Sequence, residues 1–268
     1  MARPYLRLLA LRFGVTILEP LSTYLVAKGR EVLVGVGQLD VRRARLLNDN
    51  RGLVEDLIEL GRLHGENGQL DKAKAKFDQA IETARDIGFQ SGEARAAGQL
   101  GAFYLLTGDY DVASELLEFA IRKLDKKAER PMLVDSLMRL GEVNRRRGRP
   151  QSALTAWIEA LEISQAASSH RQEAIALFNL AKASYDLKRY SDAENYYRRA
   201  LPMLNRYRDV ERIAYATFFL GVIARHFGRL SEAVRFMQES RDLFRIRKDA
   251  KHLAEAEKYL EYLAAGSQ

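Results

Sequence analysis

The chain has 268 residues and a formal net charge of +7, with 47% hydrophobic residues, 29% charged residues, 5 prolines and no cysteine. The absence of cysteine excludes disulfides, thiolate metal sites and cysteine nucleophiles, and the low proline count favours long helices over a turn-rich β architecture. The positive charge suits an acidic partner, whether peptide, nucleic acid or membrane surface, and equally an arginine-rich solvated surface.

Residues 1–52 differ from the rest of the chain and are predicted to form an atypical helical segment. Residues 5–18 are apolar on nearly every side, and Glu19–Pro20 interrupts them, because a residue before proline is disfavoured in helical geometry. A second apolar stretch ends at Lys28–Gly29, which is typical of a hairpin turn. Three interpretations stay open: a degenerate repeat with a capping helix, a helix at 5–27 that docks on a membrane surface or a partner, and a transmembrane span or signal peptide.

From residue 53 onward, one pattern recurs with a strict 40-residue period. Its anchor is a Leu–Gly pair, which is replaced once by Leu–Ala. An alanine lies twelve positions after the second anchor residue, and a bulky residue lies four positions after that alanine. The anchors are Leu60–Gly61, Leu100–Gly101, Leu140–Gly141, Leu180–Ala181 and Leu220–Gly221, the alanines are Ala73, Ala113, Ala153, Ala193 and Ala233, and the bulky residues are Phe77, Leu117, Trp157, Tyr197 and Met237. The pattern predicts five helical hairpins over 53–248, at about 53–90, 91–130, 131–170, 171–210 and 211–248.

Each recurring position has a structural reason. The anchor glycine lets two helices approach closely, because no Cβ lies between their backbones. A second glycine, present in four of the five hairpin turns, suits the left-handed residue that ends a helix. Lys188 replaces it in the fourth turn, which predicts slight strain there. The alanine and the bulky residue lie one turn apart, so they share the face of the second helix that packs on the first.

This pattern resembles the tetratricopeptide repeat, in which Leu–Gly and Tyr on one helix are followed by Ala, Phe and Ala on the next. The match is close at Leu100–Gly101, Tyr104, Ala113 and Ala120, and it weakens in the fourth repeat, which lacks both glycines. The family's commonest period is shorter by six positions, at about 34 residues, so the additional positions are expected between the second helix of one repeat and the first of the next. The spacing is similar to that of a longer-period subgroup that includes kinesin light chains and peptide-binding bacterial regulators. The resemblance implies an all-α fold, a right-handed superhelical α-solenoid of helix-turn-helix repeats.

Residues 249–268 are predicted to contain a C-terminal capping helix. Between Lys251 and Leu263, the apolar residues recur at helical spacing and share one face, with charged residues largely off it. These apolar residues are Leu253, Ala256, Tyr259, Leu260 and Leu263. A helix with one polar face is what the end of a repeat stack needs.

No set of residues in the sequence indicates catalysis. The histidines, which are His64, His170, His226 and His252, do not pair at metal-ligand spacing. The glycines occupy hairpin positions rather than a phosphate-binding loop. We therefore expect no enzymatic activity, no metal and no cofactor, and a small molecule is a disfavoured ligand.

The resemblance implies that the first helices of the repeats line a concave groove. Cationic and amide side chains there are suited to grip a carboxylate or a peptide backbone, and aromatic side chains are suited to anchor a partner. The candidates are Arg95, Arg139, Asn179, Lys182, Tyr185, Tyr215, Phe219 and Arg225. The Lys and Asn clamp of repeats that bind chaperone tails is not expected, because the matching positions are Arg62, Ala102 and Glu142.

A basic patch is expected at the hairpin turn of the third repeat, and it comprises Arg145, Arg146, Arg147 and Arg149. One interpretation is a solvated helix end, where cations offset the helix dipole. The other is a docking patch for an acidic partner. Nucleic acid is disfavoured, because acidic residues such as Asp125 and Glu129 alternate with the basic ones and no nucleic-acid-binding module is present.

The leading functional hypothesis is a cytoplasmic scaffold or adaptor that holds an extended or helical, acidic segment of a partner protein in the groove. The first alternative is a structural subunit of a larger complex at a membrane, docked through the apolar N-terminal segment. The second alternative is a regulator that senses a peptide or another ligand.

Overall fold

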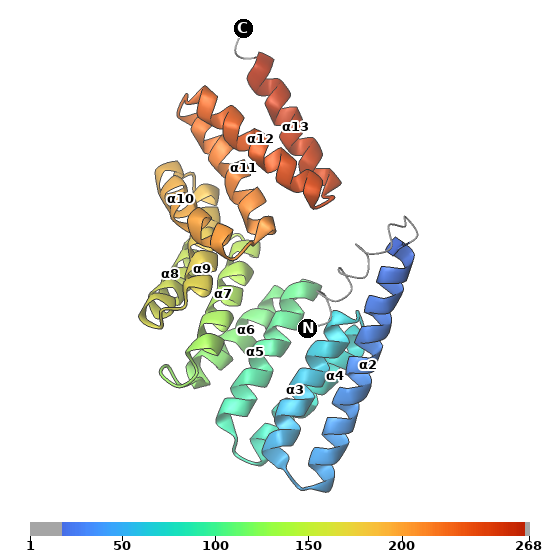
Figure 1. The fold of residues 1–268 in the computed structure, drawn as a ribbon. Helices are drawn as coiled ribbons and strands as arrows, with labels where there is room; N and C mark the ends of the chain where they lie inside the picture. The colour runs from blue at the N-terminus through green and yellow to red at the C-terminus, as the bar shows by residue number, and fades with distance from the viewer. Residues whose placement is uncertain (1–17, 266–268) are drawn as a thin grey trace. The chain divides into compact units, whose positions relative to one another are not determined.

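The computed structural model describes residues 18–265, with side chains from residue 29 on, and this range contains helices and no strand. The chain divides into two compact units between Leu124 and Asp125 (Figure 1). The first unit contains α2 (Leu18–Leu46), α3 (Asn50–Glu66), α4 (Leu70–Asp86), α5 (Gln90–Thr107) and α6 (Tyr110–Lys123). The second contains α7 (Arg130–Arg146), α8 (Pro150–Ala166), α9 (His170–Asp186), α10 (Tyr190–Arg206), α11 (Val210–His226), α12 (Leu230–Ile246) and α13 (Ala250–Ala265). Within each unit, helices that follow one another in sequence pack together, so the predicted all-α stack of helical hairpins is confirmed.

The repeat period arises from two helices of nearly equal length. From α3 to α13 the helix starts are evenly spaced along the chain, as Asn50, Leu70 and Gln90 illustrate, and most connections have three residues. Ile87–Phe89, between two repeats, is as short as Asn67–Gln69, within one. The expectation that the six additional positions lie between repeats is therefore wrong: they lengthen the helices, because each added helical residue extends the packed face.

The turns share one backbone geometry. Among the described connections, all but the one between α6 and α7 contain a residue with positive φ, which ends the preceding helix in the left-handed conformation. After α3, for example, the N–H of Gln69 donates to the carbonyl of His64 at 2.9 Å and that of Gly68 to Gly65 at 3.0 Å, which is the Schellman pattern. Lys188 has φ of 59°, so the predicted left-handed position in the fourth turn is confirmed without a glycine.

The close helix approach expected at the anchor glycines is also confirmed. A Cβ built on Gly141 would come within 2.2 Å of the indole Nε1 of Trp157, and one on Gly61 within 2.6 Å of the Phe77 ring. In the fourth repeat, Ala181 and Tyr197 occupy the two positions, and both are fully buried. In each of these hairpins, the second helix therefore packs its bulky residue directly against the backbone of the first helix.

The N-terminal helix α2 is continuous over Leu18–Leu46, so the hairpin turn predicted at Lys28–Gly29 is wrong. Pro20 lies in the first turn, where a helix needs no N–H donor. Burial of Val34 and Val41 against α3 stabilises the helix despite its three glycines. The apolar segment predicted at 5–18 lies outside the described residues, except for Leu18.

The helix predicted between Lys251 and Leu263 is confirmed as α13, which packs its apolar face on α11 and α12. None of the helices in the described part of the chain combines the length and apolar character needed to cross a membrane.

The connection between α6 and α7 is irregular. Helix α6 ends at Lys123, and Leu124 continues in an extended conformation with ψ of 138°. The Asp125 carboxylate then accepts hydrogen bonds from the backbone N–H groups of Lys127 and Ala128, at 2.7 and 2.6 Å. The boundary between the units thus falls in the connection that ends the second predicted repeat.

Candidate functional site

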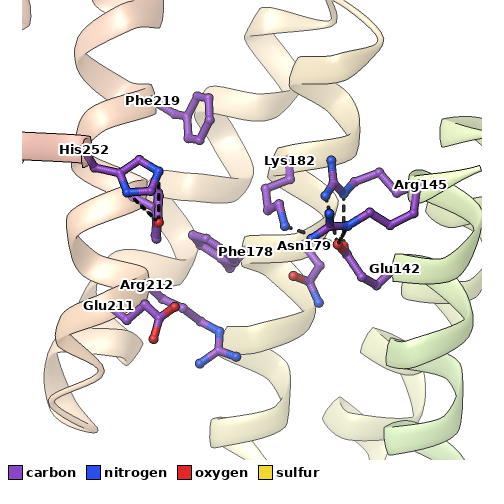
Figure 2. Close-up of a pocket in the computed structure, with 11 residues that line it drawn as sticks. Glu142, Arg145, Phe178, Asn179, Lys182, Glu211, Arg212, Phe219 and His252 are labelled. Atoms are coloured by element: carbon purple, nitrogen blue, oxygen red, sulfur yellow. Dashed lines mark hydrogen bonds and ion pairs between the residues drawn. The ribbon is translucent and has the colours of Figure 1, made fainter. Parts of the chain in front are cut away.

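A pocket of about 530 Å³ lies in the second unit, between the first helices of its hairpins (α7, α9 and α11) and the first turn of α13 (Figure 2). It is lined by Glu142, Arg145 and Arg146 of α7, Phe178, Asn179 and Lys182 of α9, Glu211, Arg212, Tyr215 and Phe219 of α11, and His252 of α13. The volume lies in the range of ligand-binding clefts. The lining is charged at two sides and aromatic between them.

One side of the pocket is a cluster of three cations around one carboxylate, which we call the Glu142 cluster. Glu142 accepts hydrogen bonds from Arg145, at 2.9 and 3.0 Å, and from Nε of Arg146 at 2.8 Å. Nζ of Lys182 lies 3.6 Å from the same carboxylate and points toward it (Figure 2). Arg145 also reaches Asp186, with Nη1 and Oδ2 3.4 Å apart. The nitrogens of Arg145 are therefore largely occupied, whereas Lys182 has only a long contact with Glu142 and a weaker attraction to Asp186.

Burial and charge shape the ionisation of this cluster. Burial raises the pKa of Glu142, but the hydrogen bond from Arg145, the charge of Lys182 and the hydrogen bond from Arg146 outweigh it and lower the pKa to about 2. Burial lowers the pKa of Lys182, and the charge of Glu142 opposes this only in part. Glu142 is thus a fixed anion at neutral pH, while the ammonium of Lys182 is incompletely compensated.

The opposite side of the pocket consists of helix N-terminal residues. Asp209 caps α11 and pairs with Arg212, whose Nη1 lies 2.5 Å from Oδ2. Glu211 pairs with Arg247 at 3.2 Å. On α13, Nδ1 of His252 lies 2.8 Å from Oδ2 of Asp249 and 3.1 Å from the hydroxyl oxygen of Tyr215. These contacts fix the start of α13 against α11.

The floor between the two charged sides is aromatic. The Tyr197 ring stacks on Phe219 with centroids 5.8 Å apart and meets Phe178 edge-on at 5.7 Å. The Tyr197 hydroxyl is buried and has no hydrogen-bond partner among the described residues, and its burial raises its pKa. Asn179 lies beside this floor, and its side-chain oxygen has no partner within the described range, while its nitrogen lies 3.6 Å from Sδ of Met138. The amide oxygen of Asn179 is available to a ligand.

The structure brings together half of the predicted groove residues. Asn179, Lys182, Tyr215 and Phe219 line the pocket. Tyr185 is not among the lining residues, but the centroid of its ring lies 4.8 Å from that of Phe219.

The three predicted groove arginines lie outside the pocket. Arg139 pairs with Asp135 at 2.8 Å, and Arg225 lies over the Tyr262 ring at 5.6 Å. Arg95 belongs to the first unit, where it pairs with Glu55. Their predicted role in binding therefore has no support from this cavity.

The predicted basic patch is divided by the fold. Arg145 is half-buried and forms ion pairs, and Arg146 lies at the pocket edge. Arg147 and Arg149 lie in the turn beyond α7, where the N–H of Arg149 donates to the carbonyl of Asn144 at 2.8 Å. The half-burial of Arg145 follows from its carboxylate partners, whose positions the linear sequence does not give.

Five pocket residues were not among the predicted site residues: Glu142, Phe178, Glu211, Arg212 and His252. A signal for two of them exists in the repeat, since His252 follows Arg212 by one full repeat period and occupies the same position on the next first helix. Extending the repeat phase to the helix starts would have found both. No group of three or more His, Asp or Glu side chains among the described residues is placed to hold a metal ion.

Comparison with solved structures places this fold among known repeat proteins. BtubC (BKLC) from P. vanneervenii superposes with a TM-score of 0.71 at 18% identity, over 82% of this chain and 92% of that one. A Rap protein complexed with Competence and Sporulation Factor gives 0.63 at 12% identity, over 89% and 71%. The nearly identical TPR-like repeats of a putative kinesin light chain from Podosopora anserina give 0.59 at 18% identity, over 73% and 96%. At these identities the likeness shows the fold alone.

Sequence comparison gives the family. A search of curated proteins finds no match. One family model described as Tetratricopeptide repeat matches residues 133–206, and a second with the same description matches 58–123 and 195–250. The two together cover more than half of the chain and coincide with its helical hairpins, so the chain belongs to the tetratricopeptide repeat family.

Proposed function

We infer that this chain is an interaction scaffold or regulator that binds a segment of a partner protein in the pocket of its second unit. The observation that carries this inference is the pocket itself, in which three successive first helices and α13 present charged, amide and aromatic side chains to one cavity. The family supports it, since repeats of this kind generally form protein-interaction folds. The Rap neighbour, solved in complex with Competence and Sporulation Factor, supports a binding role for a related fold.

The lining suits a polypeptide segment. A side-chain amide can accept from a backbone N–H of an extended chain, and the free oxygen of Asn179 is placed for this. Phe219, which is partly exposed, offers apolar surface for a partner side chain, and the buried Phe178 lines the pocket beside it. The buried ring of Tyr197 holds both rings in place.

The test compares two variants that add the same charge at different sites. Asn179→Arg fills the pocket, whereas Gln151→Arg places the same side chain on the exposed surface of α8. Full-length protein is used for affinity capture from the native host, followed by crosslinking and mass spectrometry. We expect a protein that crosslinks to α7, α9 or α11 of the unmodified chain and of Gln151→Arg, and that Asn179→Arg loses it. Equal recovery by both variants would contradict the proposal.

A second candidate function is favoured by α2. Its residues Val32, Val36, Leu39 and Leu46 are exposed, at heptad spacing, on the face opposite the buried Val34 and Val41. A solvent-facing helix ordinarily carries polar residues there. This face supports the alternative of a structural subunit that docks an apolar partner helix through its N-terminal segment. Val36→Ser with Leu39→Ser would then abolish recovery of a complex that Asn179→Arg retains.

A further inference from the structure

We propose that the pocket selects an acidic segment, with a ligand carboxylate bound by Lys182 and Arg146 and a neighbouring apolar side chain on Phe178 and Phe219. This inference rests on the proposed function and specifies the chemistry of the partner. It is carried by the donor positions and the charge around the Glu142 cluster.

The first step is the charge of the Glu142 cluster. Three cations surround Glu142, and the second anion, Asp186, pairs with Arg145 and also attracts Lys182, so the cations still outnumber the carboxylates. A basic ligand group would find Glu142 already bound by three partners. An anionic group, in contrast, meets an excess of positive charge inside a partly desolvated cavity, where electrostatic attraction is stronger than in water.

The second step is the availability of donors. Arg146 uses Nε on Glu142, and its exposed guanidinium has no other partner among the described residues. Nζ of Lys182 lies 3.6 Å from the carboxylate of Glu142, longer than an ordinary hydrogen bond, so this contact is weak and the ammonium keeps donor capacity for a second acceptor. Burial lowers the pKa of Lys182, so an incoming carboxylate would supply compensation that the ammonium lacks. Lys182 and Arg146 therefore bind the ligand, while Arg145 holds Glu142.

The third step is the apolar floor beside these donors. Nζ of Lys182 lies 5.9 Å from the centroid of the Phe178 ring, so a bound carboxylate is adjacent to an aromatic surface. A segment in which an acidic residue neighbours an aromatic or aliphatic one matches both features. The carboxylate can belong to an Asp or Glu side chain or to a free C-terminus.

The carboxylate of Glu142 competes with a ligand carboxylate for the same cations. Glu142→Gln keeps the size of the side chain and removes its charge, which leaves Arg145, Arg146 and Lys182 without their shared carboxylate. We expect this change to raise the affinity for acidic segments several-fold, roughly threefold to tenfold. A role of Glu142 confined to stability predicts no increase.

The experiment uses immobilised full-length protein and a library of random ten-residue peptides, synthesised once with free and once with amidated C-termini. The variants are Lys182→Met, which keeps the length of the side chain without its charge, Lys182→Arg as the conservative rescue, and Glu142→Gln. Circular dichroism of each variant establishes that the helices are retained.

We expect enrichment of Asp or Glu beside Phe, Tyr or Leu, a loss of affinity of about tenfold or more in Lys182→Met, and recovery in Lys182→Arg. Persistence of binding after amidation assigns the carboxylate to a side chain, and its loss assigns it to the C-terminus. Retained peptides without acidic enrichment, or equal affinity in Lys182→Met, would overturn this inference while the proposed function stands. Retention of no peptide by the unmodified protein would instead overturn the proposed function.

Discussion

The indole ring of Trp157 lies against the backbone of Gly141, in the space that a Cβ at this position would occupy. Trp157 is fully buried, and its Nε1 donates to the carbonyl of Met138 at 2.9 Å. Gly141→Ala therefore has to displace a rigid ring that also forms a hydrogen bond. We expect the free energy of unfolding to fall by about 2 kcal/mol, because overpacking outweighs the ~1 kcal/mol of helix propensity that alanine gains. Urea denaturation measures this change.

Gly221→Ala is the matched control. In the fifth repeat the new Cβ would lie 3.1 Å from Cε at the flexible end of Met237 and 3.3 Å from the backbone carbonyl oxygen of Ala233. The methionine can adjust and the backbone contact is only slightly tight, so we expect a loss of less than about 1 kcal/mol, smaller than for Gly141→Ala. Equal destabilisation by both substitutions would show that helix approach, rather than the rigidity of the facing residue, determines the cost.

The left-handed turn residue Lys188 gives a stabilising prediction. Its φ of 59° is costly for a residue with a Cβ, and glycine occupies the equivalent position in the turns at Gly148 and Gly228. Glycine removes this strain but also has the greater entropy in the unfolded chain, which cancels part of the gain. We expect Lys188→Gly to raise the free energy of unfolding by about 0.5–1 kcal/mol in net. The reverse substitution, Gly228→Lys, should lower it by a similar amount. Thermal denaturation of the two variants should give Tm shifts of opposite sign.

The sequence predicted the hairpins because their determinants lie close together. Packing within a single pair of helices determines the anchor glycine, the alanine and the bulky residue. One backbone conformation determines the turn glycines. The N-terminal helix was not predicted as one element, because Lys28–Gly29 is locally typical of a turn. Burial of Val34 and Val41 on α3 keeps the helix continuous there.

The pocket was predicted only in part for a different reason. Asn179, Lys182, Tyr215 and Phe219 followed from the repeat phase. The partnership of Glu142 with Arg145, Arg146 and Lys182 depends on side-chain directions across two helices, which spacing alone does not specify.

The depressed pKa of Glu142 predicts a pH dependence of stability. The folded-state pKa of about 2 lies below the ordinary 4.5, so the stabilisation from this carboxylate is fully present above pH 4.5. It is lost progressively as the pH falls from 4.5 toward 2. By linkage, it amounts to about 3 kcal/mol at most. Unfolding in urea at pH 7 and at pH 3 should show a stability difference between the unmodified protein and Glu142→Gln that shrinks at the lower pH.

Glu162→Gln serves as the control for this titration. Glu162 is exposed on α8 and forms no ion pair within the described part of the chain, so its substitution should change stability little at either pH. A difference for Glu142→Gln that is constant between pH 7 and pH 3 would show that the loss comes from packing rather than from its charge.

A charge network between α10 and α12 carries the last prediction. Arg229 binds Glu194 with two parallel hydrogen bonds, of 2.8 and 2.7 Å, and Arg198 contacts both Glu194 and Glu232. Two parallel hydrogen bonds from one guanidinium, within a network of charges, stabilise the fold more than an isolated surface ion pair does. A double-mutant cycle with Glu194→Gln and Arg229→Met should give a coupling energy of about 1 kcal/mol. The coupling should decrease when the salt concentration rises from about 0.05 to about 0.5 M, because these groups are only partly buried. A coupling energy near zero at low salt would mean that apolar packing alone holds α10 and α12 together, since the ion pairs would then add nothing to their association.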